Sequence, residues 1–145
     1  MDFFSSMRIS ATGMNAQQTR QNTISSNIAN AETTETEEGG PYRRQDPIMQ
    51  AQPDRENFGE ILAGAMDEHA QGVQVTEIHK DTRAPRMVYN PKHPSANKEG
   101  YVAMPNISPV EEMANMISAQ RSYEANVTAL NAAKQMANKA LEIGK

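Results

Sequence analysis

The chain has 145 residues, of which 37% are hydrophobic and 5% aromatic, and it contains neither Trp nor Cys. The formal net charge is −4 and the basic residues form no long stripe, which argues against nucleic acid as a partner. The lack of Cys excludes disulfides, thiol catalysis and Cys-ligated metals. Because apolar burial must offset the entropy of ordering the backbone, so lean a composition predicts a chain that needs partners to order fully.

The first residues carry neither a basic leader nor a long apolar run, which argues against a Sec-type signal peptide. No stretch reaches the roughly 18 apolar residues of a membrane-spanning helix, so we expect no direct membrane insertion. If the protein leaves the cytoplasm, we expect a specialised export machine to carry it without cleaving a signal peptide.

Patterning divides the chain into an N-terminal assembly helix over 1–31, an irregular loop and small β middle segment over 32–107, and a long C-terminal assembly helix over 108–145. The predicted fold is mainly α with a small β-rich middle segment. Its N- and C-terminal helices are expected to pair as a coiled-coil-like α-hairpin, extended rather than globular. The patterning leaves open whether the middle segment is a compact domain or an extended hairpin.

In the first part, residues from about 5 to 31 are predicted to form a helix, with apolar side chains on the heptad-like rows 7/14/21/28 and 11/18/25. Gln18 and Gln21 interrupt this stripe. Between Ser5 and Ala31 there is no acidic residue. A face of uncharged amides favours burial against protein on several sides, with a solvated surface as the alternative. An isolated helix of this kind is marginal, so we expect it to order only on docking.

The C-terminal helix has clearer boundaries. The sequence from Ser108 to Glu111 forms a capping box with Pro109 at the first helical position. Acidic residues at the start and lysines toward the end suit the helix dipole, and Gly144 supplies a stop. A helix over 109–143 would span about 52 Å and must project from so small a protein.

The two stripes together predict an assembly interface, although ordinary core packing is the alternative for the C-terminal stripe. Its residues lie on both terminal helices and include the amides that interrupt the apolar rows: Met7, Ala11, Met14, Gln18, Gln21, Ile24, Asn27, Ile28, Asn30, Met113, Met116, Ile117, Gln120, Tyr123, Val127, Leu130, Ala137 and Leu141.

The middle segment begins with an acidic, Gly-rich loop over 32–41. Strands are then predicted at Tyr42–Arg44 with Ile48–Gln50, Val73–Ile78, Arg86–Tyr89 and Tyr101–Met104, and turns at 90–94 and 97–100. Residues 57–71 are predicted to form a short helix or to stay mobile. Eight prolines in the chain keep any sheet small.

No pattern of residues indicates catalysis. His69, His79 and His93 lack metal-ligand spacing, and neither a carboxylate pair, a phosphate-binding loop nor a nucleophile elbow is present. We therefore expect no enzyme activity, no metal and no cofactor. The run Tyr42-Arg43-Arg44 could bind anions, form a salt-bridged strand edge, contact the nearby acidic loop or contact another protein.

Several segments, in their order, carry a resemblance. They are Asn22–Ala31 (NTISSNIANA), Gly39–Arg44 (GGPYRR), His93-Pro94, Gly100–Val102, Pro105-Asn106, Glu111–Met113 and Ser122–Asn126 (SYEAN). Together they resemble the bacterial flagellar rod and hook axial proteins, and most closely a proximal rod subunit. The resemblance covers nearly the whole chain, and residues 45–72 match least.

The resemblance implies a structural subunit of the proximal rod of the flagellar basal body, assembled through its terminal helices into the axial drive shaft and export channel. The implied partners are other copies of the chain, other rod proteins, the membrane-ring adapter and the flagellar type III export apparatus. The implied location is the periplasmic rod. The alternative function is a helical-hairpin binding module or secretion chaperone, which should form a discrete oligomer alone.

Overall fold

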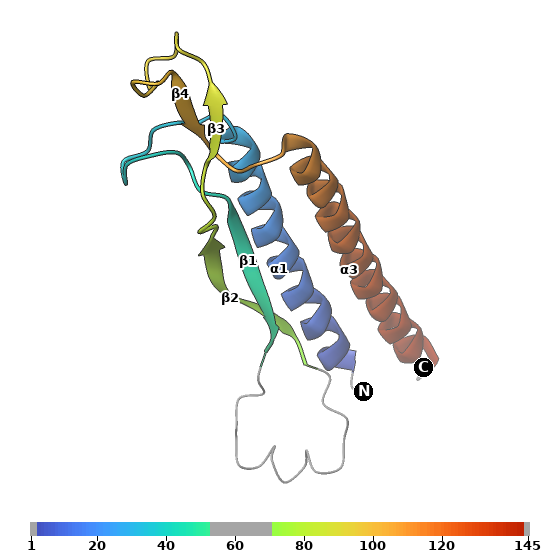
Figure 1. Ribbon diagram of the computed structural model, residues 1–145. Coiled ribbons are helices and arrows are strands. Elements are labelled where there is room, and N and C mark those ends of the chain that lie inside the picture. Colours follow the sequence, from blue (N-terminus) through green and yellow to red (C-terminus); the bar gives the residue numbers. More distant parts are fainter. Residues whose placement is uncertain (1–2, 53–70, 144–145) are drawn as a thin grey trace, which may run out of the picture.

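The computed structural model describes residues 3–52 and 71–143. The elements run α1 (Phe3–Ala29), β1 (Gln45–Ala51), β2 (Val73–Lys80), β3 (Arg86–Tyr89), β4 (Tyr101–Met104) and α3 (Pro109–Ile143) (Figure 1). The predicted fold class, mainly helical with a small β segment, is confirmed at this level. Two further predictions lie outside the described residues. One is the short helix or mobile stretch over 57–71, of which only residue 71 is described, and the other is the stop at Gly144.

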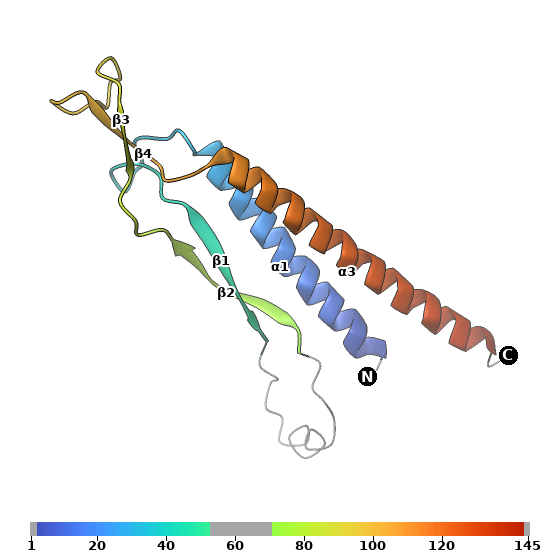
Figure 2. The same ribbon diagram turned by 45° about the vertical axis from the view of Figure 1, so that its right-hand side comes forward.

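The elements form three layers with α1 in the middle. The β1–β2 pair lies along one side of α1 and α3 lies antiparallel along the other (Figures 1 and 2). In the described part of the chain, α1 packs against β1, β2 and α3, whereas no strand packs against α3. The middle layer is therefore α1, the helix that the sequence predicts to order only on docking.

The first sheet corrects one strand boundary. β1 pairs antiparallel with β2 from Gln45 opposite Lys80 to Ala51 opposite Val73, with a register shift between Ile48 and Met49. The predicted strand at 48–50 lies within β1, which begins earlier, at Gln45, and passes through Pro47, whereas the prediction of a strand at 42–44 is wrong. Both strands of a two-stranded sheet are edge strands, where the missing N–H of proline is tolerated.

The second sheet confirms the predicted strands at 86–89 and 101–104, which pair from Arg86 opposite Met104 to Tyr89 opposite Tyr101. The rings of Tyr89 and Tyr101 meet edge to face, with centroids 5.3 Å apart. Gly100 has a φ of 83°, and a Cβ there would lie 2.9 Å from the Tyr89 ring. The pair stands beyond the end of the helices at which α1 ends and α3 begins (Figure 1).

The helices agree closely with their predicted ranges. The N–H of Glu112 donates to the carbonyl of Ser108 at 3.0 Å, so α3 starts at the predicted cap. Because α3 has 35 residues and α1 has 27, the C-terminal end of α3 extends past the start of α1 (Figure 2). The buried apolar side chains of the described residues are mostly small, as the lean composition predicts: Ala16, Ile24, Ala31, Val102, Ile107, Ala119 and Ala133.

Candidate assembly surface

One face of α3 is covered along almost its whole length. Its buried and half-buried side chains recur in alternating steps of four and three residues: Glu112, Met116, Ala119, Tyr123, Asn126, Leu130, Ala133 and Ala137. Because α1 is the described element that packs against α3, this row is the α3 side of the helix–helix seam. The alternation is the heptad spacing typical of paired helices.

The seam consists of small and polar side chains as well as apolar ones. On α1, Ser10, Ile24 and Asn27 are buried. Gly13 lies so close to α3 that a Cβ at this position would stand 2.9 Å from Oδ1 of Asn126. The helices therefore approach closely where α1 has no side chain.

The predicted interface residues fall on two different faces. Of those on α1, Ile24 and Asn27 are buried, Gln18 is exposed, and the others are half-buried: Met7, Ala11, Met14, Gln21 and Ile28. Asn30, directly after α1, is half-buried as well. On α3, five are half-buried: Met116, Tyr123, Val127, Leu130 and Ala137. The remaining four, Met113, Ile117, Gln120 and Leu141, are exposed in the single chain.

Reading the sequence by hydrophobicity missed several residues of the seam, namely Ser10, Gly13, Glu112, Ala119, Asn126 and Ala133. Their signal is the repeated spacing of small and polar side chains, which a search for apolar stripes does not register. The apolar stripe predicted for α3 thus combined a covered face with an open one.

Where α1 ends and α3 begins, the seam is polar, and we call this the polar end of the seam. Asn27 lies there and is fully buried. Its Nδ2 donates to the backbone carbonyl of Gln45 at 2.8 Å, and the backbone N–H of Gln45 donates to its Oδ1 at 2.9 Å. The side-chain amide thereby bonds both backbone groups of Gln45, as the backbone of a neighbouring β-strand would. Nδ2 also donates to Oε2 of Glu112 at 3.1 Å, so one side chain joins α1, β1 and α3.

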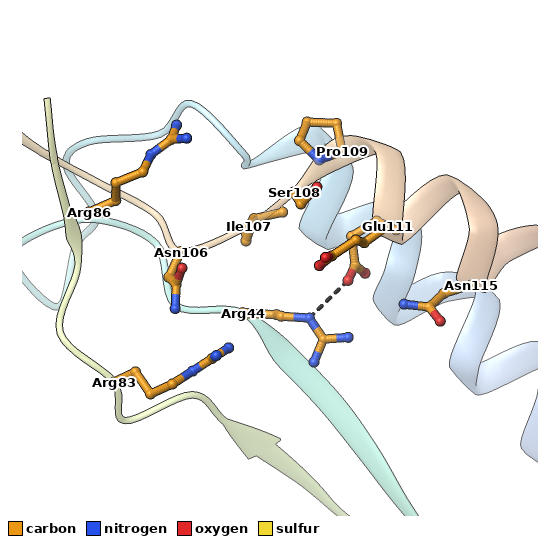
Figure 3. A pocket seen from close by; sticks show the side chains of 10 residues that line it. Arg44, Arg83, Arg86, Asn106, Ile107, Ser108, Pro109, Glu111 and Asn115 are labelled. Carbon is orange, nitrogen blue, oxygen red and sulfur yellow. Dashed lines mark hydrogen bonds and ion pairs between the residues drawn. The ribbon is translucent and has the colours of Figure 1, made fainter.

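Glu112 is 1% exposed, and its second oxygen accepts a hydrogen bond from Nε of Arg44 at 2.8 Å (Figure 3). Burial alone would lower the pKa of Arg44. The hydrogen bond and charge of Glu112, together with Asp46, outweigh that effect and raise the pKa above its ordinary value. The arginine is therefore charged at any physiological pH and neutralises a carboxylate that would be costly to bury alone.

The arginine run has internal partners. Arg44 binds Glu112, and the hydroxyl of Tyr42 lies 3.2 Å from Oγ of Ser26. Arg43 is exposed and donates to the backbone carbonyl of Asp81 at 3.4 Å. The acidic loop instead contacts Lys80, through Glu38 at 2.7 Å. Arg44 also lies 3.4 Å from Asp46 of β1, so for this residue the structure agrees with the alternative of a salt-bridged strand edge.

A polar hollow of about 490 Å³ lies beside this cluster, lined by Arg44, Arg83, Arg86, Asn106 and Asn115 among others (Figure 3). Its charges largely cancel, because Arg83 pairs with Asp81 at 2.6 Å and Arg44 with Glu112. Within residues 3–52 and 71–143, no group of three His, Asp or Glu side chains is placed to hold a metal ion. The arrangement joins three elements together and offers no pair of groups poised for proton transfer.

The outward faces of the two helices differ. The exposed positions of α1 between 15 and 25 carry uncharged side chains: Asn15, Gln18, Asn22 and Ser25. On α3 the large exposed apolar side chains of the described residues are Val110, Met113, Ile117, Met136 and Leu141. In the part of the chain that the structure describes, neither helix is apolar enough to cross a membrane.

Comparison with known proteins places both helices in known families. A model described as flagella basal body rod protein matches residues 7–35, and one described as the C-terminal part of the flagellar basal body rod FlgEFG protein matches residues 98–143. The flagellar basal-body rod protein FlgC of Bacillus subtilis is 44% identical, with all of both chains covered. That of Borreliella burgdorferi is 44% identical, covering 99% of this chain and 98% of the relative. That of Aquifex aeolicus is 39% identical over 100% and 99%.

Proposed function

The chain belongs to the FlgC family of flagellar basal-body rod proteins, and from this premise we propose how it acts in the rod. It is a structural subunit of the basal body rather than an enzyme. In the proposal it occupies the proximal, periplasmic part of the rod. Its terminal helices pack with those of other copies and other rod proteins into a drive shaft around an export channel.

The observation that carries this proposal is the antiparallel pair of α1 and α3, whose segments are the ones that the two rod-protein models match. The four-and-three spacing of the covered row on α3 supports coiled-coil packing of the pair. The exposed amides of α1 and the exposed apolar residues of α3 support contacts with further subunits, because such surfaces gain hydrogen bonds and burial on assembly.

A shaft that transmits torque requires contacts that resist sliding. The cluster of Asn27, Glu112 and Arg44 supports this role, because its directional bonds are all satisfied in one register of the two helices. A shift by one turn would leave a buried carboxylate and a buried amide without partners, which is costly.

The proposed partners also include the membrane-ring adapter at the base of the rod and the flagellar type III export apparatus. We propose that the chain passes through that apparatus unfolded and without cleavage of a signal peptide. Coupling the final ordering of α1 to docking then disfavours polymerisation away from the rod, since a partner surface must offset the ordering entropy.

Replacing Leu130 by Asp tests the assembly role. Leu130 is half-buried in the seam, so Leu130→Asp should abolish rod formation and swimming while export of the chain continues. The neighbouring exposed Asn131 supplies the matched control, Asn131→Asp. Both variants are expressed in a strain that lacks the gene, and swimming, isolated basal bodies and exported protein are measured. Normal swimming of Leu130→Asp would contradict the seam, and a discrete oligomer of the free chain would favour the chaperone alternative.

A further inference from the structure

The loop of the β3–β4 hairpin, which stands beyond the helices (Figure 1), contains the only Asn-Pro sequence of the chain, Asn90-Pro91. Asn90 directly follows β3, and its backbone carbonyl accepts a hydrogen bond from the N–H of His93 at 3.2 Å. Proline therefore occupies the second position of a β-turn, where its fixed φ is favoured. The N–H of Asn90 donates to the carbonyl of Gly100 at 2.9 Å, so the other side of the hairpin holds the turn in place.

The side chain of Asn90 differs from that of the other asparagine in this loop. Asn97 is held by two hydrogen bonds, because its Oδ1 accepts from the backbone N–H of Glu99 at 3.0 Å and of Tyr101 at 2.8 Å. The side chain of Asn90 is also exposed, but it makes no hydrogen bond within the described part of the chain. The Asn90 amide is therefore free to approach its own backbone carbonyl.

The proline at position 91 determines which reaction this amide can undergo. The ordinary reaction of asparagine in a protein is deamidation, in which the backbone nitrogen of the next residue attacks the side-chain carbonyl carbon and ammonia leaves. That nitrogen must give up a hydrogen, and Pro91 has no backbone N–H. The intramolecular reaction that remains is attack of Nδ2 of Asn90 on its own backbone carbonyl carbon.

We propose that the chain cleaves itself between Asn90 and Pro91 by this cyclisation. Nδ2 of Asn90 forms a bond to the backbone carbonyl carbon and gives up one proton to water. The bond from that carbon to the nitrogen of Pro91 breaks, and the nitrogen takes up a proton and becomes a new amino terminus. The fragment 1–90 then ends in a succinimide ring, which water opens to a terminal asparagine or isoasparagine. Nothing is oxidised or reduced, and water is the only other reactant.

Two features of the turn favour this attack. The hydrogen bond from the N–H of His93 polarises the Asn90 carbonyl and stabilises the negative charge that develops on its oxygen as the ring closes. In addition, the residue before a proline is restricted to extended conformations, so the turn presents one carbonyl orientation to the side chain. An unfolded chain lacks the first of these features. We therefore expect the reaction to be faster in the folded hairpin.

The cut changes the connection between β3 and β4 and leaves the fold in place. The fragment 1–90 contains α1 and the first three strands, and the fragment 91–145 contains β4 and α3. The two fragments remain joined by the β3–β4 pairing and by the helix seam, including the bond from Asn27 to Glu112. The cut protein therefore keeps its size under native conditions, and only denaturation separates the fragments.

Intact-mass spectrometry of the denatured full chain tests the proposal. The purified protein is kept at near-neutral pH and mildly raised temperature for several weeks, once folded and once in urea. The folded protein should yield fragments 1–90 and 91–145, and until its ring opens the first should be lighter by one water than a fragment with a free acid. Cleavage should be slower in urea, where the hydrogen bond from His93 is lost. Absence of these fragments from the folded protein, or cleavage at least as fast in urea, would overturn the inference.

Substitutions distinguish this reaction from cleavage by a contaminating protease. Asn90→Asp removes the nucleophilic amide and should abolish the cut, whereas Asn97→Asp keeps the acceptor oxygen of that side chain and should leave cleavage unchanged. Pro91→Ala should replace cleavage by deamidation of Asn90 in an intact chain, because the new residue supplies the missing N–H. A cut that persists in Asn90→Asp, or Pro91→Ala protein that is still cleaved after position 90, would contradict the cyclisation.

Discussion

The two ends of the α1–α3 seam are held together by different means. At one end Asn27, Glu112 and Arg44 form a buried network of hydrogen bonds. Toward the other, Gly13 lies against Asn126 and the covered row of α3 continues as Leu130, Ala133 and Ala137. Directional bonds specify one register, whereas close packing of small side chains mainly sets the distance between helices. The polar end therefore determines how the pair is aligned, and the small-residue end determines how closely it packs.

The largest expected effect comes from the polar end. Glu112→Ala should lower the free energy of unfolding by about 2–4 kcal/mol, because it leaves a buried amide and a largely buried guanidinium without their shared acceptor. The side chain of Arg44 is 24% exposed, so water replaces part of the loss. Urea unfolding followed by circular dichroism measures the change. Glu111→Ala, at the exposed neighbour, should change the free energy of unfolding by less than about 0.5 kcal/mol. Equal losses in both variants would show that the buried network contributes no more than an exposed residue does.

A smaller effect is expected at the close approach. Gly13→Ala should change the free energy of unfolding by less than about 1 kcal/mol, because the cost of moving the end of the Asn126 side chain offsets the gain of about 1 kcal/mol in helix propensity. Adding Asn126→Ala should relieve the crowding, so the double variant should be more stable than the sum of the single effects predicts. Thermal unfolding of the unchanged protein, the two single variants and the double variant gives the coupling free energy between positions 13 and 126. Additive effects would show that the two helices do not touch there.

The smallest effect concerns exposed ion pairs, which serve as a reference for the buried one. The hydrogen bond and charge of Lys80 lower the pKa of Glu38, and the hydrogen bonds of Arg83 lower that of Asp81. A lowered folded-state pKa contributes stability above the unfolded-state pKa, and this is lost as pH falls through the folded-state value. Stability should thus decline slightly below about pH 4.

Glu38→Gln and Asp81→Asn together should flatten that decline, and differential scanning calorimetry between about pH 6 and pH 3 measures it. The effect should be small, since exposed pairs are screened by water and salt. A decline as large as the loss in Glu112→Ala would contradict the contrast between exposed and buried pairs.

The sequence predicted those parts of the fold whose signals are local. The capping sequence at Ser108 located the start of α3. Alternating β-branched and aromatic residues located the strands at 86–89 and 101–104 and most of the strand at 73–80, which was predicted to end at 78. The strand at 45–51 was predicted only over 48–50, because a proline such as Pro47 commonly ends a strand. The proline is tolerated because the strand has a neighbour on one side only. That is a property of the sheet and not of the local sequence.

The seam was predicted only in part, for a different reason. Hydrophobic periodicity identified Ile24, Met116 and Leu130 but placed Met113 and Ile117 on the same face. The actual row passes through Glu112 instead, and a glutamate becomes a favourable interior residue only because Arg44, distant in sequence, supplies its counter-charge. A pattern read along one helix contains no information about that partner.

The separation along the chain between Asn27 and Glu112 has a consequence for timing. These bonded residues are 85 positions apart. At a synthesis rate of about 5–20 residues per second, roughly 4–17 s pass after Asn27 is made before Glu112 exists. For that interval α1 has no α3 to pack against, and the side of α1 that α3 later covers is open to any binding protein in the cell. A factor that recognises the nascent N-terminal segment would therefore act before the seam can close, and closure of the seam would displace it.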